Sequence, residues 1–60
     1  MRLREAREKI GMTQEELAQK SGVSRTTISM LENGRASCVK TVTLTKLADT
    51  LGQRVSDLFF

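Results

Sequence analysis

The chain has 60 residues, with ten Lys and Arg against seven Asp and Glu, a net charge of +3 and a single cysteine. This length allows one domain with a small core, the charge leans mildly toward polyanions, and a lone cysteine excludes an internal disulfide, so a reducing, cytoplasmic setting is expected. No apolar run reaches membrane-spanning length, and Met1 leads into a charged segment and not into a signal peptide.

The first predicted helix covers residues 2–10, because Leu3, Ala6 and Ile10 fall on one stripe at helical spacing. Gly11 ends it. Each of the four glycines follows a periodic segment, at the place where a helix C-cap favours a left-handed residue. The glycines divide the chain into five helices with no linker or internal repeat, so one domain over 1–60 is expected.

Residues 13–33 have the pattern of two short helices joined by a tight turn. Thr13 followed by Glu16 is a capping box that begins the first of them. Ser24 is the expected N-cap of the second, and Gly22 stands where the turn between them needs a positive φ. Several independent positions therefore agree on a helix-turn-helix.

The rest of the chain is predicted to form two more helices. After Gly34 comes a connection without helical periodicity. A fourth helix then follows from the spacing of Leu44, Leu47, Ala48 and Leu51. Thr41 and Thr43 are both candidate N-caps for it. The last short helix holds Val55, Leu58 and Phe59.

The helix that begins after Ser24 has an unusual outward face. On a helical wheel Ile28 and Leu31 point inward, with Ser24 near them. The outward side chains are hydroxyls, an amide, a thioether and a flanking guanidinium: Thr26, Ser29, Met30, Asn33 and Arg25. A solvated helix more often carries Glu, Lys and Gln. Arginine can bridge guanine O6 and N7, and Thr and Met methyls can meet the thymine methyl, so this face suits the major groove.

The segment GMTQEELAQKSGVSRTTISMLENGR resembles the phage repressor and Cro family of helix-turn-helix proteins, most specifically in TQEELA and LENG. The resemblance extends from Leu3 to Phe59. It implies an all-α, compact five-helix, lambda-repressor-like DNA-binding domain whose third helix enters the major groove, usually on a two-fold operator. The implied function is a sequence-specific transcriptional regulator, most simply a repressor, that binds double-stranded DNA as a homodimer.

The resemblance and the wheel together assign roles to single residues. Base reading falls on Arg25, Thr26, Ser29 and Met30. Contacts with the DNA backbone fall on six polar residues: Gln14, Ser24, Thr27, Asn33, Arg35 and Lys40. Arg7 and Glu32 match a paired arginine and glutamate that links the first and third helices. Residues 36–42 depart from the family pattern, because the connection is about one residue longer than usual and lacks its proline.

The side chains in the sequence do not support metal-binding, nucleotide-binding or hydrolytic functions. There is no histidine, one cysteine supplies no metal cluster, and the sequence has no glycine-rich phosphate loop. Ser24, Ser29 and Asp49 have no base partner of the kind that a hydrolase needs. We therefore expect no enzyme, metal, cofactor or small-molecule ligand, and Cys38 is interpreted as an incidental loop thiol.

Two function classes remain for such a chain. The first is the DNA-binding regulator, which Arg25 and the flanking cations favour. The second is a protein-binding module, such as an antitoxin that holds a toxin and can regulate its own promoter. The apolar end of the chain keeps the second class open, because aromatic side chains must be covered. A two-fold dimer would cover them through Leu58, Phe59 and Phe60.

Overall fold

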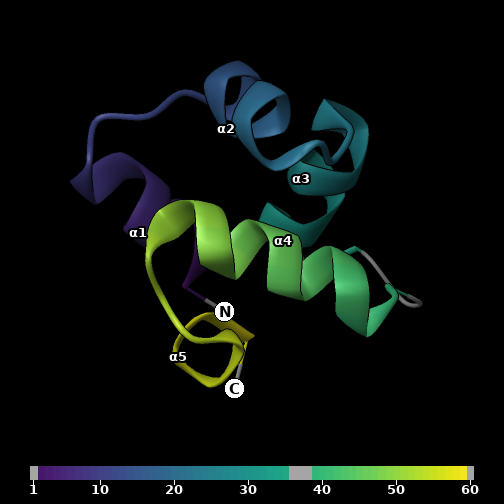
Figure 1. Cartoon of the computed structure of the whole chain (residues 1–60). Helices are drawn as coiled ribbons and strands as arrows, with labels where there is room; N and C mark the ends of the chain where they lie inside the picture. The colour runs from purple at the N-terminus through teal and green to yellow at the C-terminus, as the bar shows by residue number, and fades with distance from the viewer. Residues whose placement is uncertain (1, 36–38, 60) are drawn as a thin grey trace.

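The computed structural model describes residues 2–35 and 39–59, and these ranges contain five helices and no strand. The helices are α1 (Leu3–Lys9), α2 (Gln14–Ser21), α3 (Arg25–Glu32), α4 (Thr41–Leu51) and α5 (Val55–Phe59). In Figure 1, α2 and α3 lie together at the top, α4 crosses the middle, and α5 lies at the bottom. The expected all-α, five-helix fold is confirmed. None of the helices in these ranges is long and apolar enough to cross a membrane.

Local hydrogen bonds begin α2 and α3 at the expected residues. Thr13 Oγ1 accepts from the N–H of Glu16 at 3.1 Å, and Glu16 Oε1 accepts from the N–H of Thr13 at 3.0 Å. Ser24 Oγ accepts from the N–H of Thr27 at 3.2 Å, although Ser24 itself is exposed and does not lie on the inner face. Gly22 ends α2 with a φ of 75°, a left-handed conformation that glycine adopts without a Cβ clash.

The start of α4 differs from the sequence prediction. The sequence offers Thr41 or Thr43 as the N-cap, but the cap is Lys40, which makes no side-chain capping hydrogen bond. The Lys40 carbonyl accepts from the N–H groups of Thr43 and Leu44 at 3.0 and 3.3 Å. Both threonines therefore lie inside the first turn. The prediction was wrong because an exposed helix start can leave its first amides to water, so the best capping residue need not be the cap.

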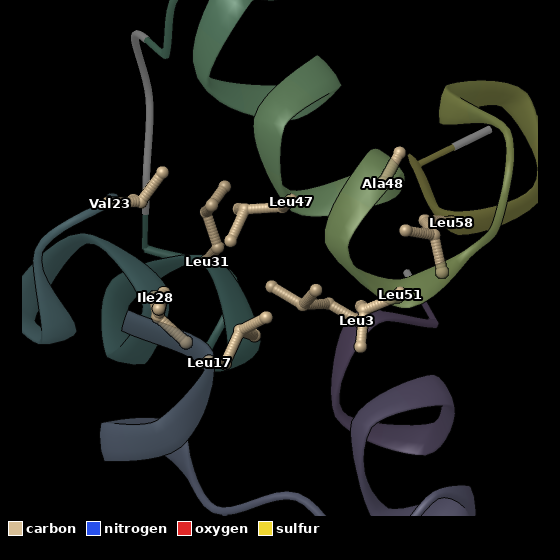
Figure 2. Packing of buried hydrophobic residues seen from close by; sticks show 9 residues of the cluster. All are labelled: Leu3, Leu17, Val23, Ile28, Leu31, Leu47, Ala48, Leu51 and Leu58. Carbon is tan, nitrogen blue, oxygen red and sulfur yellow. The ribbon is translucent and has the colours of Figure 1, made fainter. Parts of the chain in front are cut away.

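Every helix contributes to one hydrophobic core, together with the turn before α3. The buried apolar side chains point toward one another in Figure 2: Leu3, Leu17, Val23, Ile28, Leu31, Leu47, Ala48, Leu51 and Leu58. Several of them have no exposed surface at all, among them Leu3 in α1, Leu17 in α2, Ile28 in α3 and Leu47 in α4. The two helices of the helix-turn-helix are thus held from behind by α1 and α4, which leaves the outer face of α3 free.

The C-terminal helix corrects one expectation from the sequence. Leu58 is only 2% exposed and belongs to the core, and its carbonyl accepts from the N–H of Arg2 at 2.8 Å. Its side chain therefore holds α5 onto the chain and is not on the surface as a dimer contact. Phe59 is half-buried against the same core, and Phe60 lies outside the described residues.

Candidate nucleic-acid interface

The outer face of α3 lines a hollow of about 400 Å³. The residues around it are the four expected to read bases and one expected to contact the backbone: Arg25, Thr26, Ser29, Met30 and Gln14. Met30 is 41% exposed, which is high for a large apolar side chain, whereas Ile28 and Leu31 on the opposite face are buried. The structure therefore brings together on one surface residues that come from both helices of the motif.

Hydrogen bonds at both ends of α3 join its cap residues to polar side chains of the helix. The hydroxyls of Ser24 and Thr27 lie 2.8 Å apart. Asn33 Nδ2 donates to the Ser29 carbonyl at 2.9 Å and approaches Ser29 Oγ at 3.4 Å. The Asn33 amide is thus folded back onto its own helix, so a phosphate contact by Asn33 would use its remaining hydrogen or require the side chain to turn.

A buried carboxylate joins the first three helices. Glu32, at the end of α3, accepts from Arg7 Nε at 2.8 Å and from Arg7 Nη2 at 3.0 Å. Gln14 Nε2, at the start of α2, donates to Glu32 Oε1 at 3.1 Å, and Arg4 Nε lies 3.4 Å from the same oxygen. Arg7 Nη1 also donates to the Met12 carbonyl at 2.7 Å. The Glu32 side chain has no exposed surface, and that of Arg7 is 10% exposed.

Both members of the central pair are charged at neutral pH. Burial acts to raise the pKa of Glu32, but the hydrogen bonds from Arg7, Gln14 and Arg4 outweigh it and hold the pKa below its ordinary value. The hydrogen bond to Glu32 raises the pKa of Arg7 above its already high value. No buried side-chain nitrogen or oxygen in the described residues lacks a hydrogen-bond partner. The pair therefore joins α1 to α3 without leaving an unpaired charge in the core.

The remaining expected backbone contacts lie at the end of the motif and beyond it. Arg35 and Lys40 are both exposed and lie on either side of residues 36–38, which include Cys38 and lie outside the described part. The Arg35 N–H donates to the Met30 carbonyl at 2.8 Å, so the backbone of Arg35 stays attached to α3.

Sequence reasoning missed two contacts of the buried carboxylate. Gln14 was expected only at a phosphate, and Arg4 was given no role, yet both reach Glu32 over separations of 18 and 28 residues. No local pattern signals such long-range partners. One hint was present: Arg4 and Arg7 are three residues apart, so they lie on the same face of a helix.

In the described residues, five helices with a capped two-helix motif and an exposed polar face on its second helix define a helix-turn-helix domain, a DNA-binding class. The chain belongs to the helix-turn-helix family, which it matches over residues 3–58. This match confirms the resemblance seen in the sequence.

The chain is also similar to proteins named uncharacterized HTH-type transcriptional regulators. One from Archaeoglobus fulgidus is 48% identical over 58 residues, which cover 97% of this chain and 81% of that protein. One from Methanothermobacter thermautotrophicus is 43% identical over 58 residues, which cover 95% of this chain and 83% of that protein. Another from Archaeoglobus fulgidus is 40% identical over 58 residues, which cover 97% of this chain and 80% of that protein. No solved structure gives a significant match.

Proposed function

We propose that this helix-turn-helix protein, a DNA-binding transcriptional regulator, is a cytoplasmic repressor that inserts α3 into the major groove of a two-fold operator. The observation that carries the proposal is the hollow shared by Gln14 and the outward side chains of α3. In this docking Arg25 forks onto a guanine, while Thr26 and Met30 offer methyl groups to thymine. Repression follows from occupying the site, so no bond needs to be made or broken.

The start of α2 supplies the backbone contact that fixes α3 in the groove. Thr13 caps only the N–H of Glu16, so the N–H groups of Gln14 and Glu15, in the first turn, have no acceptor within the helix. They favour a phosphate, and the helix dipole adds to the attraction. Arg35 and Lys40, both exposed, extend the positive charge beyond the end of α3. Such contacts position the protein on any sequence and leave the choice of site to α3.

We further propose that two copies act together. One recognition helix covers about four or five base pairs, and about 1–3 kcal/mol per base pair is too little to single out one site in a genome. Two copies on a two-fold site place their helices about 34 Å apart, one turn of B-DNA. Phe59 is the described residue best placed for the contact between them, because it ends α5 and is only partly covered by its own chain.

The protein-binding alternative has less support. The large exposed apolar side chains of the described residues, outside the α3 face, are Ile10 at 55% and Val42 at 57%. They come from α4 and from the end of α1, and single apolar residues on a surface are ordinary. We therefore rank a toxin or another protein partner second to DNA.

Selection of bound duplexes from a random pool tests the proposal. We expect an enriched inverted repeat with half-sites about 10 base pairs apart or a multiple of that spacing. Thr26→Glu places a carboxylate on the exposed groove face and should abolish the enrichment. Lys46→Gln on α4 changes the net charge by the same single unit and should preserve it. A pool that stays unenriched, or equal results for the two variants, would count against the proposal.

A further inference from the structure

The positive charge of Arg4 is in excess of the charge required to neutralise the buried carboxylate of Glu32. Arg7 already forms two hydrogen bonds with Glu32 and neutralises it. The three charged side chains of Arg4, Arg7 and Glu32 therefore sum to +1, and the surplus lies on the exposed member. The Arg4 side chain is 56% exposed, against 10% for Arg7 and 0% for Glu32.

The guanidinium of Arg4, which carries the surplus charge, is hydrogen-bonded to Glu32. Glu32 Oε1 accepts from Arg4 through Nε, the inner nitrogen of the guanidinium. Among the described residues, the terminal Nη groups of Arg4 make no hydrogen bond, so four N–H donors of this exposed side chain are unused. An exposed ion pair of this kind contributes little to stability, so its main effect is to direct the Arg4 guanidinium toward Glu32.

This place adjoins the proposed DNA surface. Gln14 Nε2 and Arg4 Nε both bind the same oxygen of Glu32, at 3.1 and 3.4 Å. Gln14 also lines the hollow with Arg25 and Met30. A DNA strand whose phosphate rests on the N-terminus of α2 would therefore pass beside the guanidinium of Arg4.

We propose that Arg4 is a further phosphate-binding residue, oriented by Glu32 and placed beside Gln14. The inference rests on the proposed function, because DNA is the ligand. It adds a contact from α1, outside the helix-turn-helix itself. A guanidinium suits the role, since its planar fork binds phosphate oxygens with two N–H groups at once.

The salt dependence of binding to a mixed-sequence duplex tests the proposal without knowledge of the operator. Each phosphate neutralised contributes about −0.9 to the slope of log K against log salt. Arg4→Gln should therefore make the slope less steep by about 0.9, so that raising the salt from about 50 to about 200 mM costs roughly 3.5-fold less affinity than in the wild type. Arg4→Lys keeps the charge and should keep the slope.

Lys9→Gln is the matched control, because it removes one exposed cation from the same helix. Lys9 lines a different hollow with Arg2 and Gln53, toward α5, and its loss should leave the slope unchanged. A normal slope for Arg4→Gln, or an equal change in Arg4→Gln and Lys9→Gln, would overturn the role of Arg4. So would weaker binding at an unchanged slope, which marks a structural effect, or a slope lost in Arg4→Lys. If the wild type binds no duplex at any salt concentration, it is the proposed function that fails.

Discussion

Gln14 and Glu32 are hydrogen-bonded across the helix-turn-helix, with Gln14 Nε2 donating to Glu32 Oε1 at 3.1 Å. The contact ties the first residue of α2 to the last residue of α3. The two helices that line the hollow are therefore held together at the end away from their turn at Gly22, as well as at the turn itself. A substitution at Gln14 acts on this connection as well as on any phosphate contact.

The first prediction separates base reading from backbone binding. If Arg25 forks onto a guanine, Arg25→Ala should cost about 1–3 kcal/mol on the selected site and relax the preference at one base pair. Gln14→Ala should weaken binding to all sequences alike. Arg25→Lys is the control, since it keeps the charge but loses the fork. Sequence logos from duplex selection check this, and an unchanged logo for Arg25→Ala would remove the residue from base reading.

The second prediction concerns the buried ion pair. Arg7→Met leaves the carboxylate of Glu32, with no exposed surface, without its main partner, and should cost about 3–5 kcal/mol of unfolding free energy. A domain of this size has little more than that in total. The double variant Arg7→Met with Glu32→Leu should be milder than Arg7→Met alone, because no charge is left buried. Urea unfolding of the wild type, Arg7→Met, Glu32→Leu and the double variant measures the coupling, and additive effects below about 1 kcal/mol would mean that the pair is not buried in solution.

The third prediction is a loss of stability in acid. The pKa of Glu32 lies below its ordinary value of 4.5, so the unfolded chain binds this proton more tightly than the native one. The stabilisation is fully present above about pH 4.5 and is lost as the pH falls through the lower, native pKa. The pKa values of Glu16, hydrogen-bonded to the Thr13 N–H, and of Asp57, hydrogen-bonded to Arg54, are lowered too and act in the same direction.

Thermal melts from pH 6 down to pH 3 should therefore show a falling Tm. Glu32→Gln should start from a lower Tm but decline less steeply, because one of the responsible carboxylates is gone. Glu5→Gln, an exposed residue of α1, is the control and should follow the wild type. Parallel curves for Glu32→Gln and the wild type would exclude Glu32 as a source of the acid sensitivity.

The parts of this fold that could be predicted from the sequence are those decided by neighbouring residues. Thr13 and Glu16 cap α2 because they stand three residues apart in the sequence. Gly22 ends α2 because its own backbone can adopt a left-handed conformation, which depends on no distant residue. The contacts of Glu32 with Arg4 and Gln14 could not be predicted, because they depend on how three helices pack.

The burial of Leu58 and the start of α4 at Lys40 could not be predicted from the sequence either. The short apolar pattern around Leu58 is compatible with a surface patch or with a core contact, and only the position of α5 against the rest of the chain makes it a core contact. Lys40 begins α4 through its backbone alone, so no side-chain signal marks it.

The fourth prediction concerns the turn of the helix-turn-helix. A Cβ placed on Gly22 would meet no atom within 4 Å, so the cost of Gly22→Ala comes from the left-handed φ of 75° alone. We expect a loss of about 1–2 kcal/mol. Gly22→Asn should be milder, because asparagine tolerates this conformation better than alanine. Chemical denaturation measures both, and an Ala variant as stable as the Asn variant would indicate that the turn relaxes.

The last prediction concerns the proposed dimer. Leu58 is buried in its own chain and Phe60 lies outside the described residues, so Phe59 is the position to change. If two copies touch near the end of α5, Phe59→Ser should weaken binding to a full two-fold site while leaving affinity for one isolated half-site unchanged. This second measurement matters because Phe59 also packs against the core, and an unfolded variant would lose both affinities together.

Ile10→Ser is the matched control for Phe59→Ser, because it removes an exposed apolar side chain that follows α1 and does not belong to α5. It should leave both affinities near those of the wild type. Footprints and stoichiometry on the two duplexes complete the test, since a dimer gives two protected half-sites filled at one protein concentration. Independent filling of the half-sites, with Phe59→Ser equal to the wild type on the full site, would show that each copy binds alone. Base contacts within a single groove would then have to carry all the specificity, at about 1–3 kcal/mol for each base pair.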